Sequence, residues 1–162
     1  RKFGALLKTK KDPNEHVLIK NLGPEPLSNK FNGEYLFAKS RKKTLPIKNF
    51  IMDSKIVVGV GNIYANEALY LAGIRPTKKS GLISRGKYEE LSHSIVITLK
   101  EAIEAGGTTL KDYTNAKEAP GYFKKELKVY DRGGENCLKC KKILKEIRQS
   151  NRQTVYCTNC QN

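Results

Sequence analysis

The chain has 162 residues, with 31 Lys and Arg against 16 Asp and Glu, a formal net charge of +15. It contains no signal-like stretch and no apolar run near the roughly 18 residues that a membrane helix needs, so we expect a soluble, intracellular protein without a membrane partner. The basic residues are spread along the whole chain, which favours a polyanion such as nucleic acid as partner; a basic protein without such a partner is the alternative.

The first 27 residues predict connecting structure. Asp12-Pro13-Asn14 is typical of a turn before a short apolar run at 16–19. Two prolines around Glu25 oppose both helix and strand pairing, so 21–27 is predicted as a loop.

Two short helices are predicted next. Ser28 is predicted to cap the first, which runs toward Lys43 with Gly33 as a weak point inside it. Pro46 suits the first turn of the second, which covers 47–52.

A glycine turn and two longer helices follow. Val58-Gly-Val-Gly61 interrupts the helical pattern, which resumes over 62–72 and ends at Gly73. Ser84 is predicted to cap the longest helix, over 85–105, because apolar residues recur there at helical spacing.

The rest of the chain predicts a long loop and then strands. Residues 108–122 are polar and broken by Pro120-Gly121, and a loop of this length is a candidate functional element. Leu127–Tyr130 is predicted as a short strand-like run. Residues 143–147 and 154–156 alternate enough to form a two-stranded ribbon. The expected fold is therefore mainly α, followed by a small β-ribbon.

All four cysteines lie in the last 26 residues, as two C-x2-C pairs with 16 residues between them. A small hairpin can bring four thiolates at this spacing around one Zn²⁺. So short a segment buries little apolar area, so the ion is predicted to be structural, with four protein ligands and no open position for a catalytic water. A redox pair and an iron–sulfur cluster are the alternatives. The predicted ligands are Cys137, Cys140, Cys157 and Cys160.

Two places are candidate anion sites. The glycines before Asn62 permit close approach to the free N–H groups of a helix start, with Lys55 nearby in sequence; a tight turn with a capping Asn is the alternative. At the ribbon tip, Arg148 and Arg152 could clamp a phosphate or be solvated surface arginines. Tyr130 could contact a nucleic-acid backbone or belong to the core.

Five segments together resemble the formamidopyrimidine-DNA glycosylase family in order and spacing, over essentially the whole chain. The Gly-Gly-Thr-Thr-Leu run favours this branch over endonuclease VIII. The segments are the zinc ribbon, Asn21-Leu-Gly-Pro-Glu-Pro-Leu27, Met52-Asp-Ser-Lys-Ile-Val-Val-Gly-Val-Gly-Asn-Ile-Tyr64, Ala72-Gly-Ile-Arg-Pro76 and Gly106-Gly-Thr-Thr-Leu-Lys-Asp112.

The resemblance implies a DNA-repair enzyme that flips oxidised purines such as 8-oxoguanine out of duplex DNA, cleaves the glycosidic bond and nicks the abasic strand by β,δ-elimination. The implied partner is double-stranded DNA with oxidised purines or abasic sites, bound by a monomer at the nucleoid, in the bacterial cytoplasm. The family's nucleophile is an N-terminal proline followed by a glutamate, whereas this chain begins Arg1-Lys-Phe-Gly. We therefore expect no catalytic residue here and a catalytic domain immediately upstream.

By residue-level match, Arg1 and Phe3 are similar to the arginine and the wedge of the loop that the family inserts beside the flipped base. The run from Lys111 to Tyr122 matches the loop that covers the extruded base. The four cysteines match the family's zinc ligands.

Asn62 and Arg152 match the family's pair that pinches the phosphates flanking the lesion, which offsets the cost of flipping. Asn151, where glycine is common in the family, departs from the pattern and questions the geometry of the hairpin tip.

The expected organisation is a helix-two-turn-helix domain over 1–130, with an interdomain and intercalation segment at 1–27, and a zinc-finger hairpin over 131–162. The alternative function is a stand-alone zinc-dependent DNA- or RNA-binding module without catalysis.

Overall fold

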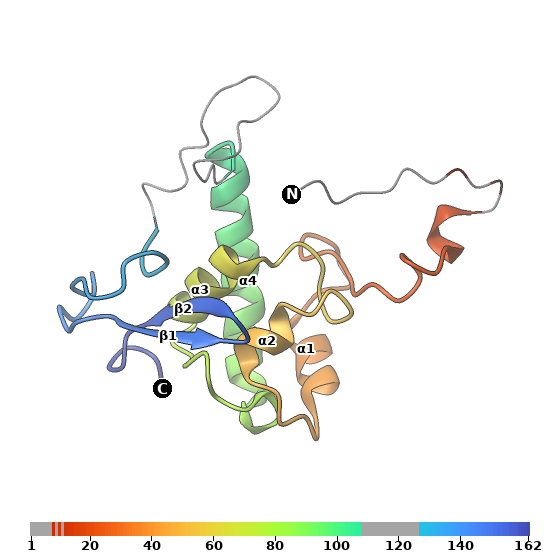
Figure 1. Ribbon diagram of the computed structural model, residues 1–162. Helices are drawn as coiled ribbons and strands as arrows, with labels where there is room; N and C mark the ends of the chain where they lie inside the picture. Colours follow the sequence, from red (N-terminus) through yellow and green to blue (C-terminus); the bar gives the residue numbers. More distant parts are fainter. Residues whose placement is uncertain (1–7, 9, 11, 108–126) are drawn as a thin grey trace.

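The computed structural model describes residues 8, 10, 12–107 and 127–162 (Figure 1). Within these residues the chain is rich in helix, with one two-stranded antiparallel sheet near its C-terminal end, as the sequence predicts. No helix in this described part is long and apolar enough to cross a membrane. The elements are α1 (Gly33–Ser40), α2 (Ile47–Ile51), α3 (Asn62–Leu71), α4 (Arg85–Glu104), β1 (Lys145–Gln149) and β2 (Arg152–Tyr156), with 3-10 turns at Pro13–Glu15 and Ser80–Leu82.

Helix α1 begins later than the sequence predicts, and the predicted cap at Ser28 is wrong. Asn32 caps the helix, because its side-chain oxygen accepts a hydrogen bond from the Tyr35 N–H at 2.8 Å. Gly33 is therefore the first helical residue rather than a weak point inside. A Cβ at Gly33 would lie 2.5 Å from Cα of Glu89, so close packing against α4 requires glycine there.

The bounds of α2, α3 and α4 agree with the predictions to within one residue, whereas α1 ends at Ser40, before the predicted Lys43. Gly73 follows α3 with φ +67, the left-handed backbone that ends a helix. Ser84 caps α4 and accepts a hydrogen bond from the Lys87 N–H. Pro46 lies immediately before α2 rather than in its first turn.

The main core lies between the helices and is centred on Tyr88 of α4, which is fully buried. Its ring meets Phe37 and Phe50 edge-on, at centroid distances of 6.2 and 6.3 Å. Its hydroxyl donates to the Ser80 carbonyl at 2.9 Å, so the polar end of the buried ring is satisfied. The long amphipathic helix thus organises the helical part of the fold.

The ribbon pairs β1 with β2 in the register Gln149 to Arg152, around a two-residue turn. Both turn residues have positive φ, 48° at Ser150 and 60° at Asn151. This backbone suits tight hairpins, and asparagine enters the left-handed region more readily than most residues. Asn151 therefore fits the hairpin tip, although the resemblance implies a glycine there.

A second, smaller core joins the ribbon to α3, so the two-stranded sheet does not stand alone. In Figure 1 the ribbon crosses α3 and its tip reaches α2. The buried residues of this core are Tyr70, Val129, Cys137, Leu144, Val155 and Cys157.

Candidate metal centre and anion-binding surface

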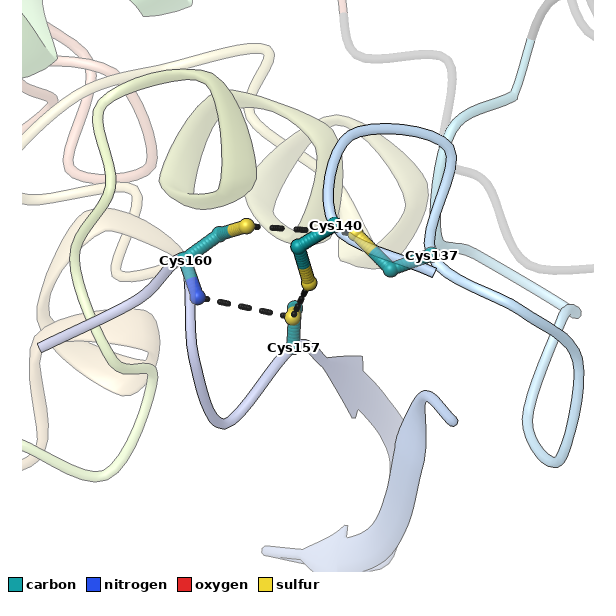
Figure 2. A group of neighbouring side chains, drawn as sticks. All are labelled: Cys137, Cys140, Cys157 and Cys160. Carbon is teal, nitrogen blue, oxygen red and sulfur yellow. Dashed lines mark hydrogen bonds between the residues drawn. The ribbon is translucent and has the colours of Figure 1, made fainter. Parts of the chain in front are cut away.

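The four cysteines converge at one point, from a loop before β1 and a loop after β2 (Figure 2). Their sulfur atoms all lie within 4.8 Å of one another. The Sγ atoms of Cys137 and Cys160 are 3.9 Å apart and those of Cys140 and Cys157 are 3.4 Å apart. These separations exceed the S–S bond length of a disulfide, roughly 2.05 Å. They are close to the sulfur–sulfur distance of about 3.8 Å in a tetrahedral site of four thiolates around Zn²⁺. The site fits one structural zinc ion, as predicted.

The first ligand is prepared for metal binding by α3. The Tyr70 hydroxyl lies 3.2 Å from Sγ of Cys137, and both groups are buried. Burial raises the pKa of the Cys137 thiol, but hydrogen bonds from Tyr70 and from the amides of Cys140 and Lys139 outweigh it and lower the pKa to about 6. The thiolate is the form that binds zinc. Burial and the neighbouring thiols raise the pKa of Cys160 to about 12 in the absence of metal.

The second cysteine loop is tied to the helices by Gln161, a residue that sequence reasoning missed. Its side chain is fully buried, accepts a hydrogen bond from the Cys157 N–H at 2.8 Å and donates to the Ile74 carbonyl at 2.9 Å. The Asn162 N–H donates to the Gly73 carbonyl. Gln161 and Asn162 therefore hold the second cysteine loop against the turn that follows α3.

The start of α3 is an open helix N-terminus. Gly61 is its N-cap and offers no side-chain hydrogen bond. Side-chain oxygen Oδ1 of Asn62, the first helical residue, is buried yet has no hydrogen-bond partner among the described residues. The N–H groups of a first helical turn and the positive end of the helix dipole favour an anion here.

The two glycines of this turn differ in what requires them. Gly59 has φ +80, which favours glycine. Gly61 has φ −82 and ψ −178, ordinary extended backbone that any residue adopts. A Cβ on Gly61 would meet no atom within 4 Å. In the described residues nothing requires glycine at 61, so the space beside the helix end is free for a ligand.

Arg152 and Arg148, the predicted clamp residues, are both exposed on the ribbon. Within the described part of the chain the Arg152 guanidinium has no hydrogen bond and no ion pair. Lys55 is exposed as well and lines an open depression that it shares with three further lysines, Lys20, Lys30 and Lys39. The exposed arginines of the ribbon and the exposed lysines of this depression thus offer positive charge to a polyanion.

One side of α3 holds the ribbon in place, which sequence reasoning also missed. The Asn66 side chain donates to the Asn62 carbonyl at 2.7 Å and accepts from the Val155 N–H of β2 at 2.9 Å. With Tyr70, polar residues recur at 62, 66 and 70, one face of a helix. This four-residue spacing of polar side chains along α3 was the available signal.

The predicted strand at Leu127–Tyr130 is wrong. The N–H groups of Lys128, Val129 and Tyr130 donate instead to the buried Glu67 carboxylate of α3, at 2.8 to 2.9 Å. Tyr130 is half-buried and packs in the same apolar cluster as Ile63, directly after Asn62 in sequence. Glu67 therefore anchors residues 128–130 to α3.

The remaining candidates, Arg1, Phe3 and Lys111 with its loop to residue 122, lie outside the described residues.

The helix-rich fold and the four-cysteine centre define a zinc-finger protein. The model of the formamidopyrimidine-DNA glycosylase H2TH domain matches residues 22–114, and the model of the zinc finger found in FPG and IleRS matches 134–162. The chain belongs to the formamidopyrimidine-DNA glycosylase family.

Individual relatives agree with this assignment. A formamidopyrimidine-DNA glycosylase of Marinomonas sp. (strain MWYL1) is 56% identical over 161 residues, which cover 99% of this chain and 59% of that protein. One of Cellvibrio japonicus (strain Ueda107) is 54% identical and is covered to 60%. The chain therefore spans about 60% of the length of these relatives.

Solved structures show the same fold. The MutM (Fpg) protein of Thermus thermophilus superposes with a TM-score of 0.85 at 33% identity, over 92% of this chain and 57% of that one. A Lactococcus lactis Fpg in complex with DNA containing an abasic site gives a TM-score of 0.81 at 35% identity, over 89% of this chain and 53% of that one.

Proposed function

We propose that this chain is the DNA-gripping portion of a DNA-repair glycosylase that excises oxidised purines, such as 8-oxoguanine and formamidopyrimidines, and nicks the resulting abasic strand. Relatives carrying the name formamidopyrimidine-DNA glycosylase support the activity. Lactococcus lactis relatives in complex with Fapy-dG-containing and abasic-site-containing DNA support the partner. The protein acts as a monomer on duplex DNA.

The observation that carries DNA binding is the open end of α3. Its N–H groups, the Asn62 oxygen and the space beside Gly61, which no described residue pairs with or fills, form a receptor for one backbone phosphate. In this proposal α2 and α3, joined by the turn at 52–61, are the helix-two-turn-helix of a domain over 1–130. The zinc finger over 131–162 presents Arg152 to a second phosphate, and Tyr130 adds a backbone contact.

Arg152→Ala is expected to weaken binding to a duplex with an abasic-site analogue by about 10- to 100-fold, because a charge-assisted hydrogen bond contributes about 1.5–3 kcal/mol. The slope of log affinity against log salt should fall by about 1, because one fewer counterion is released. Fluorescence anisotropy at several salt concentrations measures both.

Lys145→Ala is the matched control, because Lys145 is an exposed cation of the same hairpin to which no phosphate contact is assigned. It should change the affinity less than threefold. An equal loss in both variants would show a general effect of charge and would remove the assigned role of Arg152.

The chemistry is expected to need a part of the protein outside these 162 residues, because the chain spans only about 60% of the length of relatives that carry the glycosylase name. The chain should bind an 8-oxoguanine duplex without cutting it, and a protein of the relatives' full length should cut it. Strand scission on a denaturing gel measures this. Scission by the chain alone would contradict the assignment, and binding without scission by the longer protein would favour a module that only binds DNA.

A further inference from the structure

A lysine with no role in the proposed DNA contacts lies buried between the helices and the ribbon. Lys48 is the second residue of α2 and is only 1% exposed. Its ammonium donates to the Gln153 carbonyl at 2.7 Å and to Oγ1 of Thr154 at 2.6 Å, both in β2. Burying a charge is costly unless it is hydrogen-bonded, so a buried ammonium at this junction calls for a function.

The two acceptors directly follow Arg152 in the chain. The Thr154 hydroxyl, which accepts from Lys48, also lies 3.4 Å from the carbonyl oxygen of Arg152. Lys48 therefore holds the backbone from which the Arg152 side chain extends. The same strand is also held by Asn66 of α3, whose side chain accepts from the Val155 N–H.

The hairpin tip is held on α2 by the residue next to Lys48. Nδ2 of Asn49 donates to Oγ of Ser150 at 2.6 Å, and Nε2 of Gln149 donates to Oδ1 of Asn49 at 2.5 Å. Side chains of α2 thus hold both strands next to the turn: Asn49 contacts the end of β1 and the turn, and Lys48 contacts β2.

The charge of Lys48 adds an electrostatic effect. Burial, followed by the nearby Arg152 guanidinium, lowers the pKa of Lys48 to about 8, so the ammonium is still mostly charged at neutral pH. Like charges repel, which disfavours folding of the Arg152 side chain back onto α2. The guanidinium is left to extend toward solvent, where a phosphate would arrive.

We propose that Lys48 is a positioning residue for DNA binding, which fixes the start of β2 so that Arg152 meets its phosphate at a set place relative to Asn62. This inference rests on the proposed contact between Arg152 and DNA. Lys48 itself does not touch the DNA and acts through Arg152.

A double-mutant cycle with zinc-loaded protein tests the proposal, with a duplex carrying an abasic-site analogue as the probe. Lys48→Met keeps the length and apolar stem and removes the ammonium. It should weaken binding about five- to tenfold when Arg152 is present and less than twofold in the Arg152→Ala background, because residues of one hydrogen-bond network are not additive. Lys43→Met, at an exposed lysine just before α2, is the control and should be additive.

Equal losses in both backgrounds would show that Lys48 only stabilises the fold, and would overturn the proposal. Thr154→Val removes one acceptor without burying a new charge; if Lys48→Met does not fold, this variant carries the test with the same expected non-additivity. If Arg152→Ala itself binds DNA normally, the proposed role of Arg152 fails first, and the inference about Lys48 falls with it.

Discussion

Removal of zinc is expected to unfold residues 131–162 and to leave α4 folded. The ribbon has only two strands, and its small core is built partly from the metal ligands Cys137 and Cys157 themselves. Binding of a structural zinc contributes on the order of 10–16 kcal/mol to folding in small zinc peptides. The small core alone is not expected to make up for the loss of this free energy. The core around Tyr88 contains no cysteine, so the main helical core should persist.

Hydrogen exchange followed by mass spectrometry, with and without a chelator, measures this outcome. Amides of β1 and β2 should lose protection, and those of α4 should keep it. Helix α2 should loosen as well, because Lys48 would lose both acceptors in β2. DNA affinity should fall at least as far as in Arg152→Ala, and readdition of zinc should restore it. Ribbon amides that stay protected in chelator would contradict a structural role of the metal.

Gly61→Asp is expected to stabilise the protein and to abolish tight DNA binding. Residue 61 is the N-cap of α3 and has an extended backbone. A Cβ added there would meet no described atom within 4 Å. Aspartate is a better N-cap than glycine and favours the positive helix end, so the free energy of unfolding should rise by a few tenths to about 1 kcal/mol. The same carboxylate would occupy the proposed phosphate site, where a like charge costs several kcal/mol, a loss of about a hundredfold or more in affinity.

Gly61→Asn is the matched control, because asparagine has the same size and a similar capping strength without the charge. It should give a similar stability and a much smaller loss of affinity. Urea unfolding measures the free energy of unfolding, and fluorescence anisotropy measures the DNA affinity. A Gly61→Asp protein that binds the duplex as tightly as the unchanged chain would show that the end of α3 is not the phosphate site.

Patterns local in sequence predicted much of this molecule. The spacing of Cys137, Cys140, Cys157 and Cys160 indicated one zinc site, and the structure brings their sulfurs together. The apolar repeat and the cap at Ser84 gave the bounds of α4 to within a residue. Zinc geometry and helix periodicity are short-range constraints, so one sequence is enough to see them.

Predictions that depended on distant partners failed or were missing. The sequence around Gly33 does not show that α4 packs against it, so the cap of α1 was placed at Ser28 instead of Asn32. The apolar pattern of Leu127–Tyr130 suggested a strand, but its N–H groups find their acceptor in Glu67, 61 residues before Lys128. Backbone groups take whichever buried partner the fold supplies, and local pattern does not reveal it.

The sequence by itself determined the helical class, the ribbon, the metal ligands and the candidate anion residues Asn62 and Arg152. Only the tertiary structure decided how these are held together, through Lys48 and Asn66 on two helices and the β2 backbone. The physical reason is that a buried lysine or asparagine looks like any surface polar residue in the sequence. Its function appears only when its hydrogen-bond partner, about 90 to 105 residues away, lies beside it.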